Sequence, residues 1–197
     1  MSSKLGDAVP QRGNAVSKAI AHALFRAAGW RFEGMLPNER KFVMIGAPHT
    51  SNWDFLLAVA AIFSLGLRVS WMGKHTFVQG PFEPILRWLG GVPVDRRAPQ
   101  GMVGQIVEEF ERRDELVIGI APEGTRSQTK RWKTGFYHIA RAANVPIAPF
   151  SLDYGRKVIA FFEPVWPSDD MEADLARIRQ LYDGVRGRHP HLFQNEA

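Results

Sequence analysis

The stretch that decides the fold runs from Lys41 to Leu65 and reads KFVMIGAPHTSNWDFLLAVAAIFSL. Its first seven residues, 41–47, are mostly apolar, which predicts a buried strand. Residues 52–65 then predict a helix, with Ser51 as a plausible N-cap. A buried strand followed directly by a helix is the unit from which α/β proteins are built.

The same alternation continues on both sides of this stretch. Further strands are predicted at 68–72, 92–94, 115–121, 146–153 and 157–162, and helices at 15–29, 81–89, 99–113, 134–143 and 169–185. Strands that alternate with helices predict an α/β fold with a largely parallel sheet flanked by helices. The tight Tyr154-Gly155 turn predicts that the last two strands pair antiparallel, so the sheet should be mixed.

The predicted helix at 15–29 is amphipathic and basic. Its apolar face carries Val16, Ile20, Ala23, Leu24, Ala27 and Trp30, and its other face carries Lys18, His22 and Arg26. This pattern is typical of a helix that lies in a membrane interface, although an apolar face packed on the protein core is the alternative. We therefore expect residues 1–30 to form an N-terminal amphipathic membrane-surface helix and residues 31–197 a single α/β domain.

Composition narrows the classes of function. The chain has 197 residues, 45% of them hydrophobic and 23% charged, which is ordinary for a globular protein. It has no cysteine, which excludes disulfides, thiolate nucleophiles and cysteine-based metal sites. The net charge of +5 favours an anionic partner, either nucleic acid or a lipid surface, with plain solubility as the alternative. No nucleic-acid-binding module is recognisable, so we expect no nucleic acid partner.

His49 and Asp54 lie where the first strand ends and its helix begins, at the sheet edge where α/β proteins bind ligands. An imidazole, with an unperturbed pKa of about 6.5, can take a proton from an attacking alcohol. A carboxylate at the other ring nitrogen fixes the tautomer and stabilises the imidazolium. Because no serine completes a triad, the nucleophile would be the hydroxyl of the substrate. The structural alternative is a capping box formed by Ser51 and Asp54.

A basic segment follows the predicted strand 115–121. It reads PEGTRS at 122–127 and continues with Lys130, Arg131, Lys133 and Arg141. Gly124 lets the backbone approach a ligand closely, Arg126 offers a planar fork for a phosphate, and Thr125 adds a hydroxyl donor. The alternative is a solvated loop. Glu123 argues against it, because an acid among these bases suggests an internal ion pair that orients Arg126.

A second glycine- and arginine-containing segment reads GGVPVDRR at 90–97 and is preceded by Lys74. Paired glycines imply a tight turn or close packing. Arg96 follows a short predicted strand and is adjacent to Asp95, so either a structural ion pair or a binding role fits the sequence.

Four segments together resemble the lysophosphatidic acid acyltransferase family, the PlsC-like glycerolipid acyltransferases. HTSNWD at 49–54 is similar to the first family block, H-x4-D, and GGVPVDR at 90–96 to the second. PEGTRS at 122–127 reproduces the third block, and VPIAPF at 145–150 resembles the fourth. The resemblance extends from Lys41 to Leu152. It departs from the family pattern at Pro93 and Ala121, which leaves the identity of the acceptor open.

The resemblance implies that His49 is the general base and Asp54 its orienting partner. It places residues of the second and third blocks and their neighbours around the glycerol phosphate of the acceptor: Lys74, Arg96, Glu123, Gly124, Thr125, Arg126 and Lys133. The implied reaction moves a fatty acyl group from acyl-CoA or acyl carrier protein to the free hydroxyl of a lysophospholipid. The family default is 1-acylglycerol-3-phosphate, which gives phosphatidic acid.

The resemblance implies no metal and no other cofactor. We expect a peripheral protein on the cytoplasmic side of the membrane, with a lysophospholipid, the acyl donor and the membrane surface as its partners. Two alternatives stay open at this point. One is acylation of a different lysolipid, for example an amino-lipid, and the other is a non-catalytic lipid-binding relative.

Overall fold

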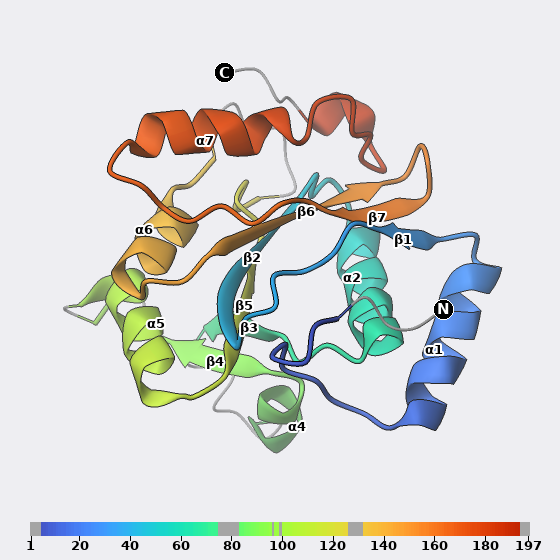
Figure 1. Cartoon of the computed structure of the whole chain (residues 1–197), viewed down its shortest axis with the longest axis horizontal. Helices are drawn as coiled ribbons and strands as arrows, with labels where there is room; N and C mark the ends of the chain where they lie inside the picture. Colours follow the sequence, from blue (N-terminus) through green and yellow to red (C-terminus); the bar gives the residue numbers. More distant parts are fainter. Residues whose placement is uncertain (1–4, 75–82, 96, 99, 126–131, 194–197) are drawn as a thin grey trace.

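The computed structural model describes residues 5–74, 83–95, 97, 98, 100–125 and 132–193, without the side chain of Lys74. A seven-stranded sheet lies between helices on both faces (Figure 1). The strands are β1 (Arg31–Glu33), β2 (Lys41–Ala47), β3 (Ser70–Lys74), β4 (Gly91–Val94), β5 (Leu116–Ile120), β6 (Ile147–Asp153) and β7 (Val158–Phe161). The helices are α1 (Ala15–Ala27), α2 (Asn52–Leu65), α4 (Glu83–Trp88), α5 (Gly101–Arg112), α6 (Gly135–Ala142) and α7 (Met171–Gln180), with a 3₁₀ turn at Pro190–Leu192.

The strand order is β1-β7-β6-β2-β5-β3-β4. The pairs from β6 through β2, β5 and β3 to β4 are all parallel. β7 runs antiparallel to β6, as the Tyr154-Gly155 turn predicts, and β1 pairs parallel with β7. The predicted mixed, largely parallel α/β sheet is therefore confirmed. β1 was not predicted, because three residues are too few to show an alternating pattern.

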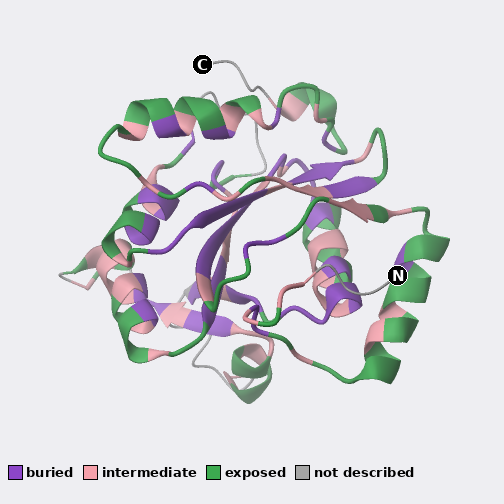
Figure 2. Ribbon diagram, in the orientation of Figure 1, coloured by how far each residue is buried: buried purple, intermediate pink, exposed green. Residues whose placement is uncertain are grey.

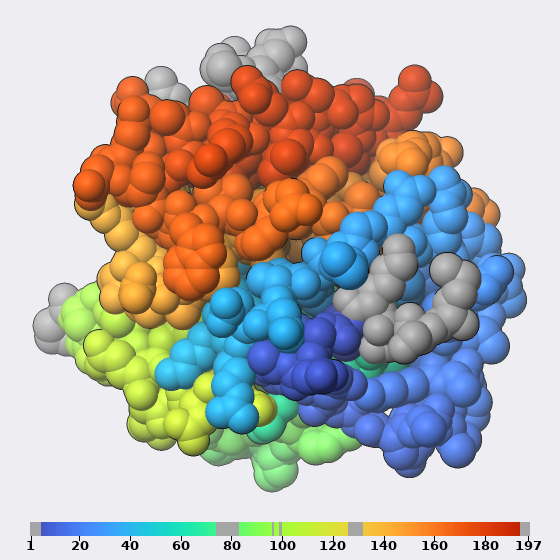
Figure 3. All heavy atoms as spheres, in the orientation of Figure 1, coloured from blue at the N-terminus to red at the C-terminus, as the bar shows by residue number. Residues whose placement is uncertain are grey.

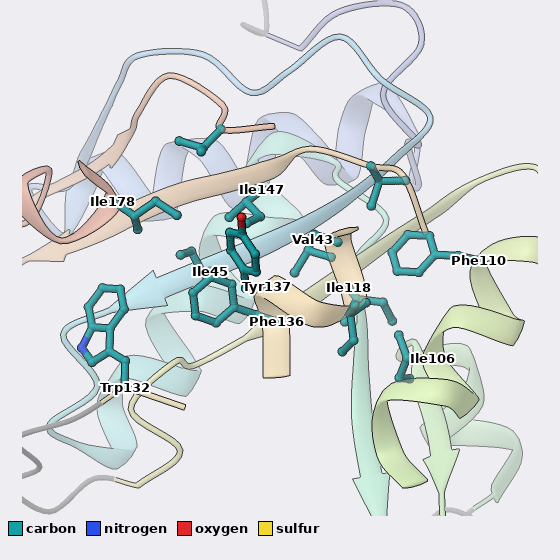
Figure 4. Packing of buried hydrophobic residues seen from close by; sticks show 14 of the residues in the cluster. Val43, Ile45, Ile106, Phe110, Ile118, Trp132, Phe136, Tyr137, Ile147 and Ile178 are labelled. Carbon is teal, nitrogen blue, oxygen red and sulfur yellow. The ribbon is translucent and has the colours of Figure 1, made fainter. Parts of the chain in front are cut away.

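The central strand β2 separates two layers of core. Val43 and Ile45 face the cluster formed with α5, α6 and α7, which Figure 4 shows around Tyr137 and Phe136 of α6. Phe42 and Met44 face the opposite cluster, which includes residues at the end of α2. Because neighbouring residues of a strand point to opposite faces, a continuous apolar run is what a strand buried on both sides requires.

Two predicted elements have other bounds than expected, each for a local reason: β3 is shifted by two residues and α7 is shorter. The segment before β3 pairs with the N-terminal arm through a Gln11–Leu67 bridge, and the Arg68 amide donates to the Pro10 carbonyl at 2.9 Å. The strand therefore joins the sheet only at Ser70. α7 ends at Gln180 instead of 185, where turns follow and Gly184 has a φ of +75°, outside the helical region.

The first helix buries a different face from the one that its apolar stripe suggested. Phe25 is 3% exposed and stacks on Phe32 at 4.5 Å between ring centroids. Val16, Ile20 and Leu24 are 67%, 57% and 67% exposed, and α1 appears largely exposed in Figure 2. These three side chains of the stripe therefore do not pack on the core, whereas Trp30, which follows the helix, does. None of the helices in the described part of the chain has the length and hydropathy that a bilayer crossing requires.

Helices lie along the borders of the face that the space-filling view shows (Figure 3). α7 forms the upper border, α5 and α6 lie to the left, and α1 lies at the opposite side. The loops that follow β2, β5 and β6 lie at the carboxyl ends of these parallel strands, where the candidate site is found.

Candidate active site

Three loops meet at the carboxyl edge of the sheet. His49 follows β2, Glu123 follows β5 and Tyr154 follows β6. β2 pairs in parallel with both β5 and β6, so the residues after these three strands emerge side by side at one edge. This is the edge where open α/β sheets bind their ligands.

Asp54 lies at the third position of α2 and is buried, with 1% of its side chain exposed. Its Oδ2 accepts the amide hydrogens of Thr50 and Ser51, each at 2.7 Å, while the Ser51 hydroxyl accepts from the Trp53 amide at 3.2 Å. The capping box considered from the sequence is confirmed. It fixes the carboxylate rigidly at the start of the helix.

The imidazole of His49 reaches the same carboxylate. His49 Nδ1 lies 3.5 Å from Asp54 Oδ2, and 27% of the His49 side chain is exposed. This separation is at the outer limit of a hydrogen bond, and catalytic pairs often tighten only when substrate binds. Because Nδ1 faces Asp54, the other ring nitrogen is the one available to a substrate. Capping and orienting are therefore compatible roles of one carboxylate.

The electrostatics of Asp54 favour its charged form. Burial by itself would raise the pKa of this carboxyl group, but hydrogen bonds from His49, Tyr154 and two backbone amides outweigh burial and lower the pKa below its usual value. The carboxylate thus stays ionised at neutral pH, as a partner for an imidazolium must.

Tyr154 completes the surroundings of Asp54. Its hydroxyl donates to Asp54 Oδ1 at 2.8 Å, and burial together with the neighbouring charge of Asp54 raises the pKa of Tyr154. The phenol therefore remains a donor. From the sequence, Tyr154 was placed only in a turn, because its partner lies 100 residues away. Its position directly after a predicted strand was the one feature of the sequence that could have placed Tyr154 in the site.

Glu123 supports the histidine from the other side. Glu123 is 2% exposed, and its Oε1 accepts the backbone amide hydrogen of His49 at 2.7 Å. Burial raises its pKa, the contacts with His49 offset part of that effect, and the charge of Asp54 adds to it. Glu123 therefore positions the His49 backbone. Its direct contact with an acceptor stays a prediction.

The C-terminal segment packs against this loop and was also missed from the sequence. The His189 amide donates to the Thr50 hydroxyl at 3.2 Å, and the Tyr154 amide donates to the Arg186 carbonyl at 2.8 Å. The guanidinium of Arg188 lies 5.2 Å from the centroid of Trp53. The segment thus ties the end of β6 to the His49 loop.

Two of the predicted phosphate-binding residues lie together after β5. Gly124 has a φ of +64°, which favours glycine, and a Cβ placed on it would lie 2.7 Å from Lys133 Cδ, so the lysine side chain passes close to the backbone here. The Lys133 amide also donates to the Pro122 carbonyl at 2.8 Å, and Thr125 is exposed beside them.

The remaining phosphate-binding candidates cannot all be placed in this arrangement. Lys74 ends β3 at the same edge of the sheet, with its side chain outside the described part. Arg96 and Arg126 lie outside the described residues. The predicted ion pair between Glu123 and Arg126 therefore stays a prediction.

An apolar groove of about 490 Å³ runs between α1 and α2 and ends beside the site. Leu24 and Trp30 line it on one side, Trp53 and Leu57 on the other, and Tyr154 closes the end near Asp54. In the described part of the chain, no group of three or more histidine, aspartate or glutamate side chains is placed to hold a metal ion. What the site presents is a base, an apolar groove and basic side chains.

Residues 30–153 match the family model described as Acyltransferase. The chain belongs to this family. It is 34% identical over 110 residues to the 1-acyl-sn-glycerol-3-phosphate acyltransferase of Escherichia coli (strain K12), a match that covers 52% of this chain and 43% of that protein. It is 30% identical over 136 residues to the Haemophilus influenzae protein of the same name, covering 64% and 55%. The chain thus spans about half the length of the curated relatives it matches.

The crystal structure of the 1-acyl-sn-glycerophosphate acyltransferase PlsC from Thermotoga maritima has the same fold. The match has a TM-score of 0.60 and 19% sequence identity, and it covers 84% of this chain and 75% of that chain. Family membership, predicted from the four sequence blocks, and the α/β fold, predicted from the alternation of strands and helices, are therefore confirmed. Tyr154 and the segment 186–189 lie beyond the end of the family match at residue 153.

Proposed function

We propose that the protein is an O-acyltransferase. It moves a fatty acyl group from acyl-CoA or acyl carrier protein to the free hydroxyl of a lysophospholipid, converting 1-acylglycerol-3-phosphate to phosphatidic acid. The observation that carries this proposal is the partly exposed imidazole of His49 beside the buried carboxylate of Asp54. The names of the relatives support this acceptor.

The geometry supports direct transfer. His49 Nε2 takes the proton of the acceptor hydroxyl as its oxygen attacks the thioester carbonyl, forming the new C–O bond. The C–S bond then breaks, and the leaving thiolate takes the proton from the imidazolium. Asp54 stabilises that imidazolium and holds the ring with Nδ1 turned inward. No covalent intermediate on the protein is required.

We place the acceptor phosphate at the basic side of the site. Lys133 and Gly124 lie after β5, and Lys74 ends β3 at the same edge. With Thr125, and with Arg96 and Arg126 from the second and third blocks, they would supply hydroxyl and cationic donors for a phosphate. The acyl chain would occupy the apolar groove between α1 and α2, which ends at Tyr154.

Replacing the histidine tests the reaction. His49→Ala should lower turnover of an acyl thioester with 1-acylglycerol-3-phosphate by about 10³-fold, because a general base typically contributes about 10²–10⁴-fold. Products are read by mass spectrometry. The control is His138→Ala, since His138 is exposed on α6. Wild-type turnover by a folded His49→Ala protein would refute the mechanism.

A panel of acceptors tests the substrate. The proposal predicts that 1-acylglycerol-3-phosphate is acylated far faster than the same lipid without its phosphate. Preference for an amino-lipid or another lysolipid would keep the reaction and replace the acceptor. No product with any acceptor or donor would favour a non-catalytic lipid-binding role.

We further propose that residues 1–30 attach the protein to the cytoplasmic surface of the membrane and that residues 31–197 form the catalytic domain. The exposed stripe of Val16, Ile20 and Leu24 supports this assignment. Ile20→Ser/Leu24→Ser should reduce co-sedimentation with anionic vesicles, whereas Met35→Ser, also at an exposed site, should not. Equal binding by both variants would contradict the attachment.

A further inference from the structure

A second pocket lies at the edge of the sheet opposite His49. It has a volume of about 870 Å³ and opens where four parallel strands begin, beside Ser70 of β3, Gly91 of β4 and Leu116 of β5, with Arg40 directly before β2. Six arginines line it against two carboxylates, which leaves a formal excess of four positive charges. His49 and Glu123 follow the other ends of these strands, so the two regions are separate.

Half of these arginines already have partners within the protein. Arg87 pairs with Glu83 of α4 at 2.6 Å, and Arg112 and Arg113 both pair with Glu109 of α5. Arg12, Arg40 and Arg68 form no ion pair with any residue in the described ranges. These three side chains are the ones available to an anion.

Arg12 is packed between aromatic rings and forms no ion pair with the described residues. Its guanidinium lies between the rings of Phe63 and Trp88, 4.7 Å from each centroid. Its Nη2 is buried and has no hydrogen-bond partner among the described residues. Burial and the charge of Arg68 both lower the pKa of Arg12. A buried charged donor without an acceptor is rare in folded proteins, and an anion would satisfy it.

The backbone keeps these two like charges close together. The Arg12 amide donates to the Gly66 carbonyl at 2.8 Å, and the Arg68 amide donates to the Pro10 carbonyl at 2.9 Å, around the Gln11–Leu67 bridge. The fold therefore places two arginines of like charge next to each other on paired backbone segments. Such an arrangement is pre-organised for a ligand that carries several negative oxygens.

We propose that this pocket binds a small anion with two or more phosphate groups, held by Arg12, Arg40 and Arg68. Guanidinium groups bind phosphate through paired N–H donors. Three guanidinium groups supply more positive charge and more donors than one phosphate group can engage. The concave shape fits a small solute that enters the pocket, whereas a flat lipid surface would meet side chains that project outward. The binding is independent of the proposed acyl transfer.

Calorimetric titration of the 197-residue protein with inorganic pyrophosphate at low salt tests the site. We expect saturable binding that is tighter than for inorganic phosphate. Arg68→Ala and Arg40→Ala, both at exposed positions, should each weaken pyrophosphate binding by about tenfold, as expected for the loss of a charged hydrogen-bonding group. Arg26→Ala on α1 removes the same charge outside the pocket and should leave the affinity unchanged.

Three outcomes would overturn the proposal. One is the lack of a specific effect of the pocket, seen either as no saturable pyrophosphate binding or as equal weakening by the control Arg26→Ala. The second is loss of binding in Lys133→Ala but not in Arg68→Ala, which would place the anion in the candidate active site. The third is an Arg68→Ala protein that loses binding to anionic vesicles and keeps pyrophosphate affinity, which would assign the arginines to lipid. An unchanged melting temperature of Arg68→Ala confirms that folding is not the cause.

Discussion

Two carboxylates flank His49, and the protein holds them in opposite ways: Asp54, at the start of α2, faces the imidazole, and Glu123, after β5, accepts the backbone amide. Asp54 accepts two backbone amides and the Tyr154 hydroxyl, and its pKa is lowered although it is 1% exposed. Glu123 is 2% exposed and accepts the His49 amide, and its pKa is raised. Burial is similar at both positions, so the number of donors decides the sign of the shift.

This difference separates two tasks. Asp54 must be a stable anion if it is to stabilise an imidazolium on His49. Glu123 contacts the backbone, where either an ionised or a neutral oxygen can accept the amide hydrogen. Asp54 and Glu123 show that two carboxylates at one edge of the sheet can have different roles, one as a charged partner of the imidazole and one as a positioning group for the backbone.

The largest effect on kcat should come from removing the charge of Asp54. Asp54→Asn should lower kcat by about 10³-fold or more, because the imidazolium loses its counter-charge and the favoured tautomer of His49 is lost. Steady-state turnover measures this.

The matched control is Asp174→Asn. Asp174 is also buried near a helix start, and it accepts the Ser168 amide at 2.7 Å and the Tyr137 hydroxyl at 2.8 Å. It should lose stability but keep the kcat of the folded protein. Equal losses of kcat in both variants would mean that Asp54 has only a structural role.

A smaller effect is expected at Tyr154. Tyr154→Phe removes one hydrogen bond to a charged group, which is worth about 1.5–3 kcal/mol and allows a loss of about tenfold in kcat. Asp54 then binds protons more readily, so activity should fall off at a higher pH on the acid side. Tyr137→Phe, which removes the corresponding bond to Asp174, should change neither. A pH–rate profile identical to wild type would contradict the positioning role.

The smallest effect concerns stability, and its sign differs between the two carboxylates. The lowered pKa of Asp54 stabilises the fold above its ordinary value of 3.8, and this contribution is lost as the pH falls through the folded-state pKa. The raised pKa of Glu123 acts in reverse, because the ionised form is disfavoured in the fold once the pH exceeds its ordinary value of 4.5.

Denaturant unfolding at several pH values tests these signs. Glu123→Gln keeps an oxygen for the His49 amide and should raise the free energy of unfolding at pH 7. Asp54→Asn should lower that free energy at pH 7 and flatten its decline as the pH falls below 3.8, where wild-type Asp54 loses its stabilising charge. A Glu123→Gln protein less stable than wild type at pH 7 would show that the ionised carboxylate is favoured after all.

The sequence alone determined the features that depend on neighbouring residues. β2 and α2 have the predicted bounds, and the capping box at Ser51 and Asp54 is present, because periodicity and capping are set within a few residues. The four blocks between Lys41 and Leu152 likewise indicated the family, which residues 30–153 confirm.

Only the tertiary structure decided which distant residues meet. Tyr154 contacts Asp54 across 100 residues, Glu123 contacts His49 across 74, and the pairing of residues 10–12 with 66–68 brings Arg12 beside Arg68. It also decided that α1 buries Phe25 and leaves Ile20 and Leu24 exposed. Such contacts depend on strand order and loop packing, which no local pattern of side chains encodes.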